Sequence, residues 1–190
     1  MNLPNKMTLL RIILIPVFMV VLYWGFPGAT WVALAIFIIA SLTDMLDGKI
    51  ARARGLVTNF GKFLDPLADK VLVITALTVL VELDEFRMSA IPLVIIIARE
   101  FMVSGLRLLA AEEGGVIAAG IWGKLKTAFT MVTIVAVLLY LSLTGDFHAA
   151  MPDAVRTWVL NGLIWISTVL TIISGLVYLK GCWKYIDSDK

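Results

Sequence analysis

Six apolar segments, each about as long as a lipid bilayer is thick, dominate this 190-residue sequence. A spanning helix needs roughly 20 mostly apolar residues, and the bilayer interior excludes loops that face lipid. Short stretches with glycine, proline or charged residues separate the segments. They cover residues 9–24, 31–53, 61–81, 90–111, 121–144 and 154–179. The sequence therefore predicts an all-α, polytopic integral membrane protein, in which six transmembrane helices form one bundle and residues 1–190 form a single domain.

The composition excludes several classes of function. With 61% hydrophobic and 16% charged residues, the chain cannot be an ordinary water-soluble domain, and a net charge of +2 gives no reason to expect a nucleic-acid partner. Cys182 is the only cysteine and His148 the only histidine, which excludes an internal disulfide, a thiolate metal cluster and Ser-His or Cys-His catalysis. Any chemistry must therefore depend on carboxylates.

The distribution of basic residues predicts the topology. If the N-terminus is cytosolic, fourteen lysines and arginines fall on or near the cytosolic side, and only Arg87 and Arg156 fall on the opposite side. Such asymmetry is the positive-inside pattern of membrane proteins. An even number of spans then returns the C-terminus to the cytosol.

Four aspartates interrupt the second and third apolar segments. Asp44 and Asp47 are three residues apart and Asp65 and Asp69 are four apart, so each pair shares one face of its helix. If the two helices are antiparallel about a loop near residues 56–57, the pairs face each other at nearly equal height. At about 1.5 Å rise per residue, the carboxylates would lie about 6–12 Å inside the cytosolic helix ends.

Clustered carboxylates in a membrane need counter-charges. Each intramembrane acid costs roughly 2.5–3.5 kcal/mol, and two carboxylates about 4 Å apart repel by about 4 kcal/mol at an effective dielectric constant of 20. An all-oxygen ligand set favours magnesium, manganese or calcium over zinc. Four acids suit a two-metal site, which can bind phosphate oxygens during an in-line displacement.

Three neighbouring residues fit a phosphate ligand. Gly48 and Gly61 would let a bulky group approach the helix backbone, and Arg52 can offer two parallel hydrogen bonds to a phosphate. The alternative is that the glycines only allow close helix packing and that Arg52 only anchors the topology.

The aspartates belong to a longer pattern. Starting at Asp44, the sequence reads D-x2-D-G-x2-A-R-x8-G-x3-D-x3-D, with eight fixed residues over twenty-six positions. This pattern resembles the signature of the CDP-alcohol phosphatidyltransferases at every fixed position. The resemblance implies that Asp44, Asp47, Asp65 and Asp69 bind two divalent metal ions, Mg²⁺ or Mn²⁺, and that Asp69 is also the general base. It further implies six spans, a homodimer and a site open to the cytosol.

The resemblance also implies a binding site for CDP-diacylglycerol and extends over most of the chain. The residues that it assigns to this lipid substrate are Asn5, Thr8, Gly48, Ala51, Arg52, Thr58 and Gly61. Outside the aspartate signature, the chain is most similar to bacterial members of the family that use sn-glycerol 3-phosphate as acceptor. This implies that Arg99, Arg107, Lys124 and Lys126 bind the acceptor phosphate, in a protein of the bacterial cytoplasmic membrane. The alternative for Lys126 is an ordinary cytosolic anchor.

Two other functions stay open at this point. Serine, inositol phosphate or another phospholipid could replace glycerol 3-phosphate as acceptor, because the aspartate signature does not specify the alcohol. A divalent-cation transporter would also place carboxylates inside a helix bundle. Transport sites usually lie near the midplane and often between inverted repeats. The four acids lie toward one side and no repeat is visible, so we expect an enzyme.

Overall fold

The residues that the computed structural model describes are mostly helical, and they contain no strand. Backbone positions are described for residues 3–54, 59–84, 86, 88–112, 120–145 and 151–183. Side chains are described for residues 5–43, 61, 64–84, 86, 88–111, 120–145 and 151–183. Six α-helices and one π-helical segment follow one another along the chain: α1 (Leu3–Trp24), α2 (Ala29–Arg54), α3 (Asn59–Glu82), α4 (Ala90–Glu112), α5 (Ile121–Gly145), η1 (Val155–Leu160) and α6 (Asn161–Cys182). The predicted all-α membrane protein with six helices is confirmed.

Among the described residues, three helical stretches are long and apolar enough to cross a membrane. They comprise Asn5–Trp24 of α1, Ile121–Gly145 of α5, and the continuous helical stretch Val155–Cys182. In α2 an apolar stretch covers Ala29–Thr43, and Thr43 is the last residue of this helix whose side chain is described. Helices α3 and α4 carry acids and bases along their length. The protein is therefore a multi-pass membrane protein, and a span for each of the six helices remains a prediction.

The chain divides into two compact units. Unit 1 contains residues 1–87 and 134–151, and unit 2 contains residues 88–133 and 152–190. Two compact units can belong to one domain, so a single domain over residues 1–190 stays a prediction. Helix α5 contributes its first half to unit 2 and its second half to unit 1.

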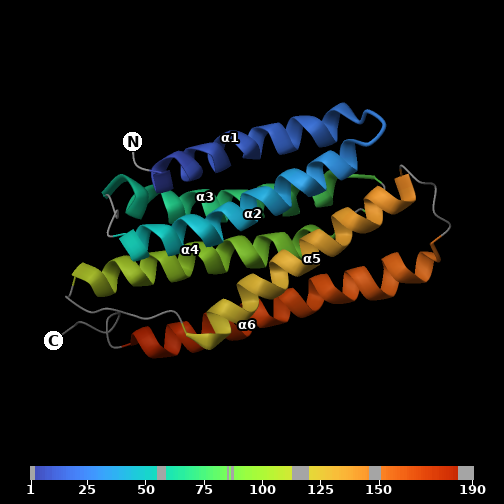
Figure 1. The fold of residues 1–190 in the computed structure, drawn as a ribbon. Coiled ribbons are helices and arrows are strands. Elements are labelled where there is room, and N and C mark those ends of the chain that lie inside the picture. Colours follow the sequence, from blue (N-terminus) through green and yellow to red (C-terminus); the bar gives the residue numbers. More distant parts are fainter. Residues whose placement is uncertain are drawn as a thin grey trace. The chain divides into compact units, whose positions relative to one another are not determined.

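In unit 1, α1 lies beside both α2 and α3, and α2 also contacts α3 (Figure 1). The interior of this unit consists of apolar side chains such as Phe18, Phe37 and Leu72, none of which has any exposed surface. The rings of Phe18 and Phe37 lie 6.2 Å apart, centroid to centroid, where α1 meets α2. This packing fixes which face of α1 is turned toward α2 and α3.

In unit 2, α4 packs against α6, and η1 leads directly into α6. Gly175 of α6 makes the close approach of α4 feasible. A Cβ atom at this position would lie 3.2 Å from Cγ of Arg99 and 3.2 Å from Cε of Met102, both on α4. A side chain there would force these two side chains of α4 to shift by a few tenths of an ångström.

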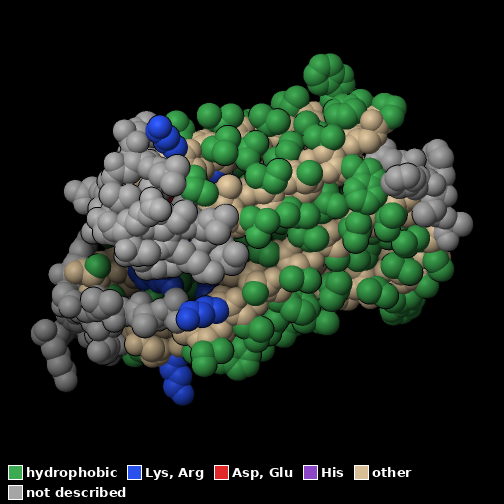
Figure 2. Space-filling view, in the orientation of Figure 1, with side chains coloured by type: hydrophobic (Ala, Val, Ile, Leu, Met, Phe, Trp, Pro, Cys, Tyr) green, Lys and Arg blue, Asp and Glu red, His purple; other side chains and the backbone are tan. Residues whose placement is uncertain are grey.

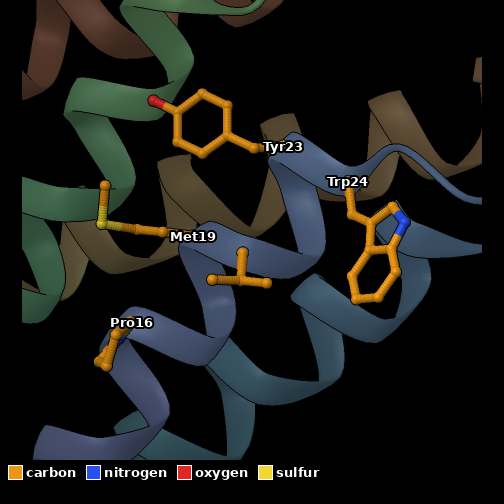
Figure 3. A pocket seen from close by; sticks show the side chains of 5 residues that line it. Pro16, Met19, Tyr23 and Trp24 are labelled. Atoms are coloured by element: carbon orange, nitrogen blue, oxygen red, sulfur yellow. The ribbon is translucent and has the colours of Figure 1, made fainter.

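Large apolar side chains cover much of the visible outer surface (Figure 2). Ile13, Val94, Val132 and Leu176 are each more than half exposed. In water such a surface would promote aggregation, whereas in a bilayer it contacts lipid chains. Figure 3 shows one shallow groove in this surface, where Pro16, Met19, Val20, Tyr23 and Trp24 of α1 form its lining.

Candidate functional site

Two carboxylates lie on one face of α3 in unit 1. Asp65 and Asp69 are four residues apart in a continuous helix, so their side chains project from the same side, as predicted. Both residues are half-buried, and Oδ1 of Asp69 is buried. Pro66 lies between them inside α3 and has no N–H to donate to the carbonyl four residues earlier. This part of α3 is therefore rich in oxygen acceptors.

A threonine of α1 contacts the first of these acids. The Thr8 hydroxyl donates a hydrogen bond to Oδ1 of Asp65, with 2.5 Å between the oxygens. Thr8 is almost completely buried, with 1% of its surface exposed. The bond joins residues 57 positions apart and fixes the orientation of the Asp65 carboxylate relative to α1. The structure therefore brings together two residues that the sequence assigned to different roles.

Two other polar residues of α1 follow the same helical repeat. Asn5 and Arg11 lie three residues before and after Thr8, and both are buried. Nε of Arg11 donates to the carbonyl oxygen of Ala40 in α2, at 3.3 Å. One face of α1 thus carries an amide, a hydroxyl and a guanidinium into unit 1, next to α2 and α3.

The remaining residues of the predicted donor site belong mostly to the end of α2. The residues predicted there to bind metal or CDP-diacylglycerol fall within the α2 backbone, but their side chains lie outside the described residues: Asp44, Asp47, Gly48, Ala51 and Arg52. Thr58 lies outside the described residues altogether, and Gly61 is buried in α3. The face-to-face arrangement of the two acid pairs therefore stays a prediction.

The described acids fit a hard divalent cation. Asp65 and Asp69 offer carboxylate oxygens, which Mg²⁺ and Mn²⁺ prefer, and Thr8 orients one of them. Within the residues that the structure describes, no three His, Cys, Asp or Glu side chains gather into a metal-binding group. The other two predicted ligands, Asp44 and Asp47, are not among those residues. The donor set on α3 can thus form half of the expected ligand set.

Two arginines of α4 are bound by hydroxyl groups of α6 in unit 2. A terminal nitrogen of Arg99 donates to Oγ of Ser174 at 2.6 Å, and Nε of Arg107 donates to the Tyr178 hydroxyl at 2.9 Å. The Arg107 guanidinium also stacks on the Tyr178 ring, 5.4 Å from its centroid. Helix α6 therefore holds both of the arginines that were predicted to bind the acceptor phosphate.

Lys126 of α5 forms an ion pair with Glu100 of α4. The Lys126 side chain is only 3% exposed, and its Nζ contacts Oε1 of Glu100. The same carboxylate oxygen lies 3.7 Å from a terminal nitrogen of Arg99. Lys124 is exposed on the same helix, two residues earlier. Unit 2 thus contains all four predicted phosphate-binding cations, with Arg99 and Lys126 sharing one carboxylate.

The sequence did not reveal Ser174 or Tyr178. Both lie in an apolar segment where single hydroxyl groups are common, and nothing in their neighbours marks them. One signal was available: the two hydroxyl residues are four positions apart, so they occupy one face of a helix. The sequence does not show whether that face is turned toward α4, because this depends on how α6 is rotated about its own axis.

Comparison with known proteins places the chain in a family. The sequence profile of the CDP-alcohol phosphatidyltransferases matches residues 1–173. A Bacillus subtilis protein named CDP-diacylglycerol–glycerol-3-phosphate 3-phosphatidyltransferase is 42% identical, over 99% of this chain and 98% of its own length. Proteins of the same name from Rickettsia bellii and Pseudomonas fluorescens are each 38% identical, over 97% and 100% of this chain and 97% and 94% of their own lengths. The chain therefore belongs to the CDP-alcohol phosphatidyltransferase family.

Proposed function

We propose that the protein transfers the phosphatidyl group of CDP-diacylglycerol to sn-glycerol 3-phosphate, giving phosphatidylglycerol phosphate and CMP. The observation that carries this proposal is near-full-length similarity to several relatives whose names state this donor and this acceptor. The two carboxylates on α3 and the cation set of unit 2 provide chemistry that the two substrates need. Transferase activity of the phosphatidyltransferase class follows from the family itself.

The donor's pyrophosphate would be held by metal and by residues of unit 1. Members of this family generally depend on divalent metal ions. Asp44, Asp47, Asp65 and Asp69 would hold Mg²⁺ or Mn²⁺, which supplies positive charge to the pyrophosphate oxygens when bound. Asn5, Gly48, Ala51, Arg52, Thr58 and Gly61 complete the set that we assign to CDP-diacylglycerol.

The transfer step requires a base and a stabilised leaving group. Asp69 would take the proton from the primary hydroxyl of glycerol 3-phosphate as that oxygen bonds to the phosphorus that carries diacylglycerol. The bond between this phosphorus and the CMP oxygen breaks, so that CMP leaves with the electron pair. Arg52 would offset the charge that develops on CMP, an effect that often contributes several kcal/mol.

The acceptor phosphate would bind to cations of unit 2. Nε of Arg107 donates to the Tyr178 hydroxyl. The two terminal nitrogens of Arg107 can then donate two parallel hydrogen bonds to phosphate oxygens. Arg99, Lys124 and Lys126 add positive charge, partly balanced by Glu100. A dianionic phosphate suits such a set better than an acceptor without a phosphate group, such as serine, would.

The cellular setting is proposed on the same basis. The exposed apolar helices make this a multi-pass membrane protein. We place it in the bacterial cytoplasmic membrane as a homodimer, because the similarity to the family implies both. We place both termini and the site on the cytosolic side, because the basic residues follow the positive-inside pattern.

An assay with purified protein in detergent micelles tests the proposal. CDP-diacylglycerol and Mg²⁺ are supplied with glycerol 3-phosphate, serine, inositol phosphate or no acceptor, and both CMP and the lipid product are measured. We expect equal amounts of CMP and phosphatidylglycerol phosphate with glycerol 3-phosphate only, and none after chelation with EDTA. Turnover with a different alcohol but not with glycerol 3-phosphate would reject the proposed acceptor. Absence of CMP with every acceptor would reject the proposed reaction.

A further inference from the structure

The Thr8 hydroxyl differs from most of the threonine hydroxyls in the described helices. Threonines such as Thr78, Thr133 and Thr168 donate to a carbonyl four residues earlier in their own helix. Such a local bond is the usual way in which a helical threonine satisfies its hydroxyl in an apolar environment. Thr8 instead donates to a carboxylate on another helix.

The bond restricts the Asp65 carboxylate. A hydroxyl has a single proton to donate, and Thr8 gives it to Oδ1, at 2.5 Å. Thr8 itself is held in place because it is 1% exposed and its helix packs against both α2 and α3. With Oδ1 engaged by a fixed donor, the carboxylate keeps one orientation, and Oδ2 and the remaining lone pair of Oδ1 stay available to a cation.

We propose that Thr8 is a positioning residue for the metal site, which orients the Asp65 carboxylate toward the cation rather than contacting CDP-diacylglycerol. The proposal rests on the proposed function, in which Asp65 is a metal ligand. Partners that orient a metal ligand typically change metal affinity or activity by about 10- to 100-fold when they are removed. A buried hydroxyl that reaches a carboxylate but not the protein surface suits this role better than it suits direct contact with a lipid substrate.

The test compares three variants of the full-length protein in detergent micelles. Thr8→Val keeps the shape of the side chain and removes the hydroxyl, whereas Thr8→Ser keeps the hydroxyl. Thr168→Val is the matched control, because Thr168 is also 1% exposed but donates within its own helix. Binding of Mn²⁺ without substrates is measured from the electron paramagnetic resonance signal of the free ion, and the Mn²⁺ concentration for half-maximal CMP release is measured in parallel.

We expect Thr8→Val to raise the Mn²⁺ dissociation constant and the half-activating concentration about 10-fold or more. Turnover at saturating Mn²⁺ should stay within about threefold of the wild type, and Thr8→Ser and Thr168→Val should match the wild type in both measurements. A merely structural role would not change the metal requirement selectively.

Other outcomes overturn the inference. Suppose that the wild type binds Mn²⁺ and releases CMP. If Thr8→Val then has an unchanged affinity for Mn²⁺, the role of Thr8 is rejected and the proposed function stays intact. A raised KM for CDP-diacylglycerol that persists at saturating Mn²⁺ would show direct substrate contact instead. If Thr8→Val does not fold, Thr8→Ala replaces it, and failure of both would assign Thr8 to helix packing. A wild type that neither binds Mn²⁺ nor releases CMP would reject the proposed function itself.

Discussion

Replacing Lys126 with methionine should destabilise unit 2, because Glu100 would lose the closer of its two cations. Lys126 contacts Oε1 of Glu100, and Arg99 lies 3.7 Å from the same oxygen. Methionine has a similar length, is a good helix former and has no charge, so the substitution changes the electrostatics with little change in packing.

The size of the effect follows from the burial of the pair. The Lys126 and Glu100 side chains are 3% and 16% exposed. Removing one partner of a buried ion pair costs about 3–5 kcal/mol. Because Arg99 still faces the carboxylate, we expect a smaller loss, of about 2–3 kcal/mol. For a protein of this size, such a loss lowers the melting temperature by about 4–12 °C.

Thermal unfolding in detergent, followed by size-exclusion chromatography after heating, measures this shift. Lys124→Met is the matched control, since Lys124 is exposed on the same helix, and its melting temperature should change by less than about 2 °C. The double variant Lys126→Met with Glu100→Gln should recover at least half of the loss, because it leaves no unpaired carboxylate. A double variant no more stable than Lys126→Met, or a single variant as stable as the control, would refute the reasoning.

Two further predictions concern the reaction. Asp69→Asn should reduce CMP release at least about 100-fold, because an amide cannot take the proton from the hydroxyl of glycerol 3-phosphate. The variant should still bind CDP-diacylglycerol. Retention of a tenth of the wild-type turnover would show that Asp69 is not the base. Tyr178→Phe keeps the ring that stacks on Arg107 but removes the hydroxyl that accepts from Nε. It should raise the KM for glycerol 3-phosphate about 3- to 10-fold with an unchanged KM for CDP-diacylglycerol, as expected for loss of one partly exposed hydrogen bond; an equal rise in both would contradict a specific acceptor role.

The positions of most helices could be predicted, because an apolar segment long enough to cross a bilayer has to form a helix. The segment 121–144 corresponds to α5, which covers Ile121–Gly145, and the segment 154–179 corresponds to η1 together with α6. The π-helical turn Val155–Leu160 was not predictable, since it differs from an α-helix only in hydrogen-bond register and no residue type specifies it. The turn at residues 25–28 followed from its glycines and its proline.

The candidate site was predictable only where it depends on one helix. That Asp65 and Asp69 share a face follows from their spacing in α3. The bond from Thr8 to Asp65, and those from the arginines of α4 to the hydroxyls of α6, join residues 57 to 75 positions apart. Such contacts depend on how each helix is rotated about its axis, and a uniformly apolar helix gives no periodic signal that fixes this rotation.

The side-chain contacts of the described residues show that apolar helices provide polar partners for helices that carry charges. Helices α1, α5 and α6 meet the length and hydropathy expected of a span, whereas α3 and α4 carry acids and bases. Both α3 and α4 are contacted by polar side chains of an apolar helix: α1 provides Thr8 for Asp65 and Tyr23 for Glu82, α5 provides Lys126 for Glu100, and α6 provides hydroxyls for both arginines of α4.

This pattern has a physical reason. A charged side chain inside a bilayer is expensive unless a polar partner replaces water, whereas a single hydroxyl adds little cost to an otherwise apolar span. Helices such as α3 and α4 can then keep the charges that chemistry on phosphates requires, because their neighbours satisfy those charges. The low hydropathy of these two helices and the presence of a candidate site on them therefore have the same cause.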